Sequence, residues 1–426
     1  MNPEQTAQQD PRISLRGVCK IFGSQTDEAL SLLDQGHTKE EVQKATGVVV
    51  GVHDVSFDIY PGEIFVIMGL SGSGKSTLLR LINRLHDPTR GQILIDGEDI
   101  TKLSHSALRD LRRRKFGMVF QSFALLPHRT VLSNVEFGLE VQGVERAERR
   151  RRAFEAIETV GLSGYENKYP AQLSGGMQQR VGLARALAAN SEILLMDEAF
   201  SALDPLIRSQ LQDDLLEIQD RLGKTIVFVS HDLDEAIKIG TRIAILRGGR
   251  LVQVGTAQEI LSQPADDYVA AFVRGADCTK VYTAQDIMLP LQTVAYLKDS
   301  PRTVLRKMEK SGFDGLVVID AARRFYGYIK VEDVTTQLKA PVIDPTKLHP
   351  LPTANLDTPL AELIQLAAEQ GGPIVISDAR SRVVGVINKS TLLAVLAETT
   401  ISSTEESPET SSGDEARSDP EQTHVE

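Results

Sequence analysis

Short, almost continuous apolar runs recur along the first 275 residues and alternate with segments of helical periodicity. The clearest runs lie at residues 64–68, 117–120, 193–196 and 225–230. Strands that are apolar on both faces are typical of a parallel sheet covered by helices. Alternation of such strands with helices is typical of α/β folds. We therefore expect an α/β domain over residues 12–275, with these runs in its central sheet.

Residues 24–50 interrupt this pattern with a polar segment that favours helix. Thr38 and Glu41 have the spacing of a capping box, and Gly36 and Gly47 favour helix ends. We expect a helical insertion on the surface, without chemistry of its own.

From about residue 282 the pattern changes to an internal repeat. The strand-like sequences at 325–329 and 383–387 lie 58 residues apart, and each follows another apolar run and precedes a helix start. This predicts two compact units of the β-α-β-β-α kind, at 280–339 and 348–397. Residues 399–426 are rich in Ser, Thr, Glu and Pro, which indicates a disordered tail.

Composition narrows the class of protein. A hydrophobic content of 41% and a charged content of 25% are ordinary for globular domains, and 426 residues suffice for two or three of them. The two cysteines, Cys19 and Cys278, are too few for a disulfide framework and fit a reducing compartment. No run approaches the ~20 apolar residues that span a bilayer. If the protein drives transport, another chain must supply the pore.

The formal net charge of −11 is concentrated in the tail, because residues 401–426 hold eight acidic residues and one basic residue. The rest of the chain is close to neutral, which does not favour nucleic-acid binding. Of two basic runs, at 109–115 and 146–152, the second alternates with Glu at helical spacing and indicates a solvated helix face. No aromatic residues interleave to stack bases. We expect no nucleic-acid partner.

A phosphate-binding loop follows the apolar run at 64–68. Residues 69–77 fit GxxxxGK[ST] between a predicted strand and a predicted helix, the context that gives this motif its meaning. The backbone N–H groups of such a loop wrap phosphates, the lysine reaches the β- and γ-phosphates, and the hydroxyl after it binds Mg²⁺. The candidate ATP-binding residues are Gly69, Ser71, Gly72, Gly74, Lys75, Ser76 and Thr77, with Ser76 also a candidate Mg²⁺ ligand.

Two adjacent carboxylates, Asp197 and Glu198, end the run at 193–196. Downstream of a phosphate-binding loop, the first would hold Mg²⁺ and the second would polarise the attacking water as general base. His231 ends the run at 225–230. A lone histidine is as often structural, but the carboxyl end of a buried strand is well placed to meet a γ-phosphate.

The sequence LSGGMQQR at 173–180 resembles the LSGGQ signature of the ABC transporter ATPases, with Met177 in place of the usual Gln. Six motifs follow one another in the order of that family. They are the phosphate loop, Gln121 after an apolar strand, the signature, the paired carboxylates, SALD at 201–204 and His231. The resemblance covers about residues 13–274. It implies a P-loop ABC ATPase with a RecA-like core, a helical subdomain and an antiparallel β subdomain, and ATP and Mg²⁺ as its ligands.

The resemblance also implies how the site is assembled. Two such domains would dimerise head to tail, so that Ser174, Gly175 and Gly176 of one copy would serve the ATP of the other. Asp204, at the end of SALD, would join the nucleotide site in that dimer.

Two further residues take roles from the resemblance. Phe22 matches the aromatic residue that stacks on adenine, although a core aromatic is the alternative. Gln121 would sense the γ-phosphate and Mg²⁺, and residues 122–127 after it would meet the coupling helices of a permease.

Within the ABC group, residues 65–77, 121–128 and 196–208 look like the ATPase subunit of glycine betaine/proline importers, and Ala199 stands where most ABC ATPases have Pro. This implies ATP-driven uptake of quaternary amines or related compatible solutes. The implied partners are a second ATPase subunit, integral-membrane permease subunits and an extracytoplasmic substrate-binding protein or domain. The implied location is peripheral, on the cytoplasmic face of the membrane.

The C-terminal repeat resembles a tandem of cystathionine-β-synthase-type (CBS) modules, which implies regulation by a nucleotide or by osmotic and ionic conditions. Asp333 fits the place of the aspartate that holds ribose hydroxyls in such modules. Lys330 replaces the usual Ser or Thr, and Thr391 stands at the aspartate position of the second module. A standard AMP or ATP site is therefore not favoured, and another nucleotide or the sensing of salt stays open.

Three other functions compete: an ABC ATPase for another solute, a non-transport ABC ATPase of DNA repair or translation, and a nucleotide sensor with vestigial hydrolysis. Repair members separate the two phosphate motifs by a long coiled coil, and translation members carry two cassettes. Neither feature is present. Intact Lys75, Glu198 and His231 argue against vestigial hydrolysis.

Overall fold

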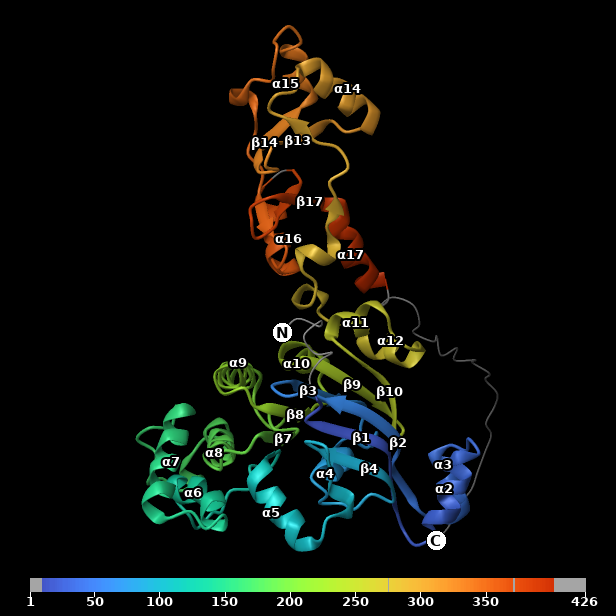
Figure 1. Ribbon diagram of the computed structural model, residues 1–426, viewed down its shortest axis with the longest axis vertical. Helices are drawn as coiled ribbons and strands as arrows, with labels where there is room; N and C mark the ends of the chain where they lie inside the picture. Colours follow the sequence, from blue (N-terminus) through green and yellow to red (C-terminus); the bar gives the residue numbers. More distant parts are fainter. Residues whose placement is uncertain (1–9, 275, 371, 402–426) are drawn as a thin grey trace, which may run out of the picture.

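The computed structural model describes residues 10–274, 276–370 and 372–401 (Figure 1). Residues 10–274 form a broad base, and the C-terminal repeat forms a column above it, with the second repeat unit next to the base and the first unit farther away (Figure 1). The predicted tail at 399–426 lies outside the described residues from 402 onward. Within the described residues, no helix combines the length and the apolar character needed to cross a bilayer.

A six-stranded sheet forms the centre of the base. Four neighbouring strand pairs are parallel and the edge pair is antiparallel. In spatial order the strands are β10 (Arg250–Gly255), β9 (Arg242–Arg247), β3 (Ile64–Met68), β8 (Thr225–Val229), β7 (Ile193–Asp197) and β6 (Phe116–Phe120). The four apolar runs that the sequence predicted as strands are confirmed as β3, β6, β7 and β8, and β3, β7 and β8 are buried along their whole length.

A second, antiparallel sheet packs near the first one. In spatial order its strands are β2 (Val49–Ile59), β1 (Ile13–Phe22), β4 (Arg90–Ile95) and β5 (Glu98–Asp99). The helix α4 (Lys75–Ile82) shares one apolar core with both sheets, and its four buried apolar side chains are inaccessible to solvent. The helix that follows the phosphate loop is thus fixed on both sides by burial.

Helices cover the remaining faces of the base. A group on one side consists of α6 (Val131–Val141), α7 (Arg146–Thr159) and α8 (Gly175–Ala188), which pack on one another (Figure 1). The others are α5 (His105–Lys115), α9 (Pro205–Leu222), α10 (Leu233–Ile239), α11 (Ala257–Ser262) and α12 (Asp267–Val273), with 3₁₀ turns η1 (Ile100–Lys102) and η2 (Pro170–Gln172). This matches the predicted core, helical subdomain and antiparallel β subdomain.

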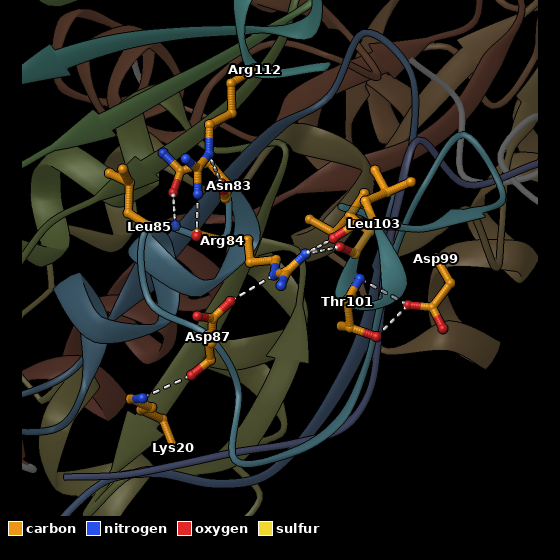
Figure 2. Close-up of polar contacts among 10 residues, drawn as sticks. Lys20, Asn83, Arg84, Leu85, Asp87, Asp99, Thr101, Leu103 and Arg112 are labelled. Atoms are coloured by element: carbon orange, nitrogen blue, oxygen red, sulfur yellow. Dashed lines mark hydrogen bonds and ion pairs between the residues drawn. The ribbon is translucent and has the colours of Figure 1, made fainter. Parts of the chain in front are cut away.

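Hydrogen bonds from two arginines hold the carboxyl end of α4 in place (Figure 2). Arg112 of α5 donates to the carbonyls of Asn83 (2.8 Å) and Arg84, at the negative end of the helix dipole. Arg84 donates to the carbonyls of Ile100 (2.9 Å) and Leu103 (2.7 Å). Part of the basic run at 109–115 therefore anchors the phosphate-loop helix.

The second basic run lies on α7, and two of its arginines are paired with glutamates of the same helix. Arg151 contacts Glu148 at 2.7 Å and Glu155 at 2.5 Å, and Arg152 contacts Glu148 at 2.6 Å. The predicted solvated face with i,i+3 and i,i+4 pairs is confirmed.

The insertion forms α2 (Thr26–Asp34) and α3 (Lys39–Thr46). The capping box of Thr38 and Glu41 is present, and Gly47 ends α3 in the left-handed region at φ 71°. The two guanidinium bonds from Arg90 to Asp34, at 2.6 and 2.9 Å, attach α2 to β4.

The C-terminal residues form two units with the predicted β-α-β-β-α order. The first contains β12 (Ala295–Tyr296), α14 (Pro301–Ser311), β13 (Gly315–Ile319), β14 (Phe325–Lys330) and α15 (Val331–Thr336). The second contains β15 (Thr353–Asn355), α16 (Leu360–Glu369), β16 (Ile374–Ser377), β17 (Val383–Ile387) and α17 (Lys389–Ile401), with η4 (Pro345–Lys347) between the units. Ile319 pairs with Phe325 and Ser377 with Val383, so the hairpin register repeats at the 58-residue offset.

The start of the repeat region packs with the second unit. After η3 (Cys278–Lys280), α13 (Ala284–Ile287) contributes Ala284 and Ile287 to the core of the second unit. The strand β11 (Leu289–Pro290) then pairs with β17. The range 280–339, expected as the first module, therefore contains a segment that belongs in space to the second one. The first unit is joined to the rest of the column by both of its chain ends.

Candidate functional site

The phosphate loop connects β3 to α4, and three of its glycines have positive φ: 147° at Gly69, 75° at Gly72 and 99° at Gly74. A Cβ at Gly69 would lie 2.3 Å from the carbonyl oxygen of Leu246, and one at Gly74 equally close to that of Gly51. The loop therefore needs glycine for its backbone angles and for its close contact with two neighbouring strands.

Lys75 begins α4 and its side chain is buried beneath the loop. Its ammonium donates to the carbonyl oxygens of Gly69 (2.8 Å) and Leu70 (3.1 Å). Burial lowers the pKa of Lys75, while the nearby carboxylates of Glu198 and Asp197 act in the opposite direction. A phosphate bound in the loop would give this ammonium a negatively charged partner.

Ser76 and Asp197 bring the loop and the end of β7 together. Ser76 donates from Oγ to Asp197 Oδ1 at 2.8 Å, and Arg80, one turn farther along α4, lies 3.4 Å from Asp197 Oδ2. A hydroxyl and a carboxylate oxygen at this separation are the hard oxygen donors that Mg²⁺ prefers, so the two residues fit the predicted metal site.

Glu198 and His231 follow adjacent parallel strands. Glu198 Oε2 lies 3.5 Å from His231 Nδ1, and His231 is more than half exposed. Glu198 has a positive φ of 47°. Its N–H donates to Val229 at 3.2 Å and its carbonyl accepts from Ser201 Oγ at 2.9 Å, which hold this strained conformation in place.

These groups surround one open cleft of about 600 Å³. Its lining residues are Gly69, Leu70, Ser71, Gly72, Gly74, Lys75, Ser76, Thr77, Glu198 and His231. The structure thus brings the predicted phosphate loop, general base and histidine together, because all of them stand at the carboxyl ends of neighbouring strands.

Sequence comparisons identify the class of protein that carries this cleft. The profile of the ABC transporter family matches residues 52–201. The glycine betaine transport ATP-binding protein of Bacillus subtilis (strain 168) is 48% identical over 390 residues, which cover 91% of this chain and 92% of the relative. This chain belongs to the ABC transporter ATP-binding proteins. Proteins of this family are ATPases, so the chain is an ATP-binding protein.

Two further comparisons agree with that assignment. The glycine betaine/proline betaine transport system ATP-binding protein of Escherichia coli (strain K12) is 47% identical over 389 residues, or 90% of this chain and 97% of the relative. A solved structure from Clostridium perfringens, part of an ABC transporter complex, is 25% identical. It covers 63% of this chain and 96% of its own, with a TM-score of 0.51.

The candidate adenine residue Phe22 lies at the end of β1, beside this cleft. A Cβ at Gly51 would lie 2.9 Å from the Phe22 ring and 3.0 Å from Thr77 Cγ2, so these three residues are immediate neighbours. The ring is 36% exposed and makes an edge contact with His86 at 5.5 Å. Phe22 is therefore not a core aromatic, and it lies beside the last residue of the phosphate loop.

Gln121 follows β6, whose last residue Phe120 pairs with Asp197. Gln121 is exposed and is absent from the residues that line the cleft in this ABC ATPase. The two residues after Ser122, Phe123 and Ala124, have positive φ of 60° and 47°. Arg185 of α8 donates to both of their carbonyls, at 3.3 and 2.7 Å. The loop that carries Gln121 is therefore tied to the helix that carries the signature.

The signature residues lie at the amino end of α8 and do not line the cleft of their own chain. Ser174 is the N-cap of α8 and accepts from the N–H of Met177 at 3.3 Å, with Gly175 and Gly176 in the first turn. Asp204 is likewise the N-cap of α9. One chain therefore presents the signature as a separate, exposed helix end.

A buried polar cluster behind His231 was missed by the sequence reasoning. Glu235 of α10 accepts from Ser230 Oγ and, at 3.1 Å, from Gln212 Nε2. Asp232 caps α10 and is paired with Arg208 of α9 at 3.2 Å. Burial raises the pKa of Glu235. The spacing of Asp232 and Glu235 resembles a capping box, which could have indicated a fixed turn after His231.

Lys39 was also missed, because the insertion was expected to have no part in the site. Its ammonium lies 3.3 Å from the carbonyl oxygen of Gly72, on the outer side of the phosphate loop. Nothing in the sequence around Thr38 and Glu41 indicates which side of the base α3 packs on.

In the C-terminal repeat, the candidate ribose-binding residue Asp333 already has a partner. Its Oδ2 lies 2.8 Å from Nε2 of His349, a residue in the connection between the two units. Tyr328 and His349 also exchange two backbone hydrogen bonds of 2.8 Å.

Proposed function

We propose that this chain is the ATP-hydrolysing subunit of an importer for quaternary ammonium solutes of the glycine betaine type. One observation carries the ATPase part: the loop at Gly69–Thr77, Glu198 and His231 line one cleft, and Asp197 is hydrogen-bonded to Ser76 of that loop. The solute class is supported by the relatives from Bacillus subtilis and Escherichia coli, whose names specify glycine betaine and proline betaine transport.

The roles of the residues follow from their contacts. Lys75 exchanges its carbonyl partners for phosphate oxygens when ATP enters the loop. Ser76 and Asp197 would hold Mg²⁺, which when bound neutralises charge on the β- and γ-phosphate oxygens. Glu198 takes the proton of the attacking water, and His231, 3.5 Å away, fixes the position of that carboxylate and contacts the γ-phosphate.

The remaining predicted residues act in a dimer. Ser174 is exposed and Gly175 and Gly176 are half-buried at a helix amino end, where N–H groups and the helix dipole favour a phosphate. We infer that they close over the ATP of a second copy, with Asp204 at the same boundary. Gln121 joins the site when its strained loop moves.

The partners of such a subunit are a permease and a substrate-binding protein or domain. The segment 122–127 contains the strained residues Phe123 and Ala124, tied to α8 by Arg185. A permease that contacts this segment would therefore be connected to the signature helix through Arg185. The chain would accordingly lie on the cytoplasmic face of the membrane, held there by its partner.

The C-terminal units at 280–339 and 348–397 fit tandem CBS modules with a regulatory role. Their β-α-β-β-α order and matching hairpin register support this assignment. The pairing of Asp333 with His349 removes the free carboxylate that a ribose would need. We therefore do not propose a standard adenine nucleotide, bound at Asp333, as the regulator.

Uptake by the complete transporter tests the proposal. The chain, its permease and its substrate-binding protein are reconstituted in vesicles with ATP on the side of this chain, and import of labelled glycine betaine is measured. We expect ATP-dependent import that unlabelled proline betaine inhibits and methionine does not. Glu198→Gln should abolish it. ATP hydrolysis without import of either betaine would refute the solute class.

A further inference from the structure

A cleft of about 340 Å³ lies between the two repeat units, lined by β13 and β14 of the first, by β17 of the second and by the segment after α13. None of its 14 described lining residues is Lys, Arg or His. Its one charged residue is Asp314, which makes no side-chain hydrogen bond or ion pair with the described part of the chain. A phosphate group in this cleft would meet a negative charge and no cation.

Two aromatic residues stand beside that carboxylate. Phe313 is 47% exposed, although its ring is large and apolar. Tyr328 reaches across the hairpin, and a Cβ at Gly315 would lie 2.2 Å from its hydroxyl, so the ring position depends on glycine there. Tyr328 and Asp314 both line the cleft, and burial together with the charge of Asp314 raises the pKa of Tyr328.

The internal repeat shows that these residues are not required by the fold. The second unit has the same hairpin register, 58 residues on. At that offset the counterparts of Phe313, Asp314 and Tyr328 are Gly371, Gly372 and Val386. The combination of two aromatic rings and a carboxylate thus occurs in one unit alone, and Val386 contributes an apolar wall to the same cleft.

We propose that this cleft binds a quaternary ammonium compound, with its alkylated nitrogen against Phe313 and Tyr328 and with Asp314 as counter-charge. Aromatic faces and a carboxylate recognise such a cation, and the apolar residues of β11 and β17 suit its methyl groups. The amides of Gln292 and Asn388, which make no side-chain hydrogen bonds within the described residues, can donate to the carboxylate of a betaine.

This inference rests on the proposed function in one respect: the ligand belongs to the class of solute proposed for transport. A solute site on the regulatory units would report the internal concentration of that solute to the ATPase. The second repeat unit lies next to α11 of the base (Figure 1), and Gln258 of α11 donates to Asp286 of α13 at 2.6 Å. A contact path from the cleft to the ATPase base is therefore present.

Calorimetric titration of the purified full-length chain tests the site. The probes are tetramethylammonium chloride and glycine betaine, with sodium chloride as the matched salt and AMP as the competing ligand class. We expect both probes to bind with one site per chain. Phe313→Leu and Asp314→Asn should each weaken tetramethylammonium binding by about 3- to 30-fold. Tyr326→Leu, an exposed aromatic of β14 outside the cleft, is the control and should bind normally.

Three results would overturn the inference: no binding of either probe, binding that neither variant weakens, or binding of AMP that Phe313→Leu abolishes. Asp314 is exposed and its side chain has no polar partner among the described residues, so its variant should fold, which far-ultraviolet circular dichroism checks. The uptake assay reads the proposed function separately. Vesicles that fail to import glycine betaine, combined with a chain that binds tetramethylammonium in this cleft, would refute the transport proposal and leave the site standing.

Discussion

The side-chain hydroxyl of Ser76 donates a 2.8 Å hydrogen bond to Oδ1 of Asp197. These residues lie 121 positions apart in the chain, and the bond joins the first turn of α4 to the carboxyl end of β7. Because both are buried or half-buried on rigid elements, the phosphate loop and the acidic strand end are held in register by the protein itself. Glu198, the next residue, is positioned by the same strand.

Replacement of Glu198 by Gln removes the proposed general base while keeping its size. We expect ATP turnover to fall by at least about 100-fold, since a positioned base contributes about 10²- to 10⁴-fold. ATP binding should persist, so size-exclusion chromatography with ATP should show an accumulated dimer. Glu217→Gln, on the exposed face of α9, is the matched control and should hydrolyse ATP normally. A Glu198→Gln protein with normal turnover would exclude Glu198 as the base.

Two glycines of the phosphate loop should respond differently to alanine. At Gly74 the new Cβ would lie 2.3 Å from the carbonyl oxygen of Gly51, whereas at Gly72 nothing lies within 4 Å. Both have positive φ, which costs roughly 1–2 kcal/mol for alanine. Gly74→Ala should therefore lower the thermal midpoint clearly more than Gly72→Ala does. Equal midpoints would show that β2 yields easily to the loop.

The strands and the phosphate loop could be predicted because their signals are local. A continuous apolar run such as 64–68 followed by a glycine-rich turn specifies both the element and its chemistry. Ser76, Asp197 and His231 could be placed at one edge because parallel strands share a carboxyl edge. Their separations could not be predicted, since these depend on the strand order β3-β8-β7.

What the sequence did not indicate arises from packing between distant segments. Lys39 meets Gly72 because of the side on which α3 docks, and that side is decided by Arg90, Arg250 and the apolar core under α2. The packing of α13 and β11 with the second unit also depends on contacts between distant segments. Their short sequences have no pattern that distinguishes the sheet of the near unit from that of the far one.

Glu235→Gln should change the dependence of stability on pH. Burial raises the folded-state pKa of Glu235 above its ordinary value of 4.5, so the carboxyl group binds its proton more tightly when folded. The resulting stability is complete below the unfolded pKa and is lost as pH rises through the folded pKa. Glutamine cannot lose this proton. The free energy of unfolding of Glu235→Gln relative to wild type, measured by urea denaturation, should therefore rise from pH 4.5 to pH 8, by roughly 1.4 kcal/mol per unit of pKa shift.

The control for this comparison is again Glu217→Gln, whose urea midpoint should follow the wild type at every pH. A Glu235→Gln protein that loses stability toward neutral pH would show the reverse. In that case the hydrogen bonds from Ser230 and Gln212 stabilise an ionised carboxylate more than burial opposes it.

Mixing of two inactive variants tests whether the exposed signature serves a second copy. Lys75→Ala removes the ammonium beneath the phosphate loop. Ser174→Asp keeps an N-cap for α8, because aspartate caps as well as serine, and places a negative charge where a partner's phosphate would lie. Each variant alone should lose ATP affinity or turnover, and neither contains an intact composite site.

In a mixed dimer of the two variants, one site combines the intact loop of the Ser174→Asp copy with the intact signature of the Lys75→Ala copy. Random pairing of equal amounts should restore at most about a quarter of the wild-type ATPase rate, if the two sites act independently. Mixing Lys75→Ala with the Lys75→Ala/Ser174→Asp double variant forms no intact site and should stay inactive. If the first mixture also stays inactive although both copies dimerise, either the signature acts within its own chain or hydrolysis needs two intact sites. A tethered dimer of one wild-type copy and one double-variant copy distinguishes these two explanations, because it has an intact chain but no intact composite site. It should hydrolyse ATP only if the signature acts within its own chain.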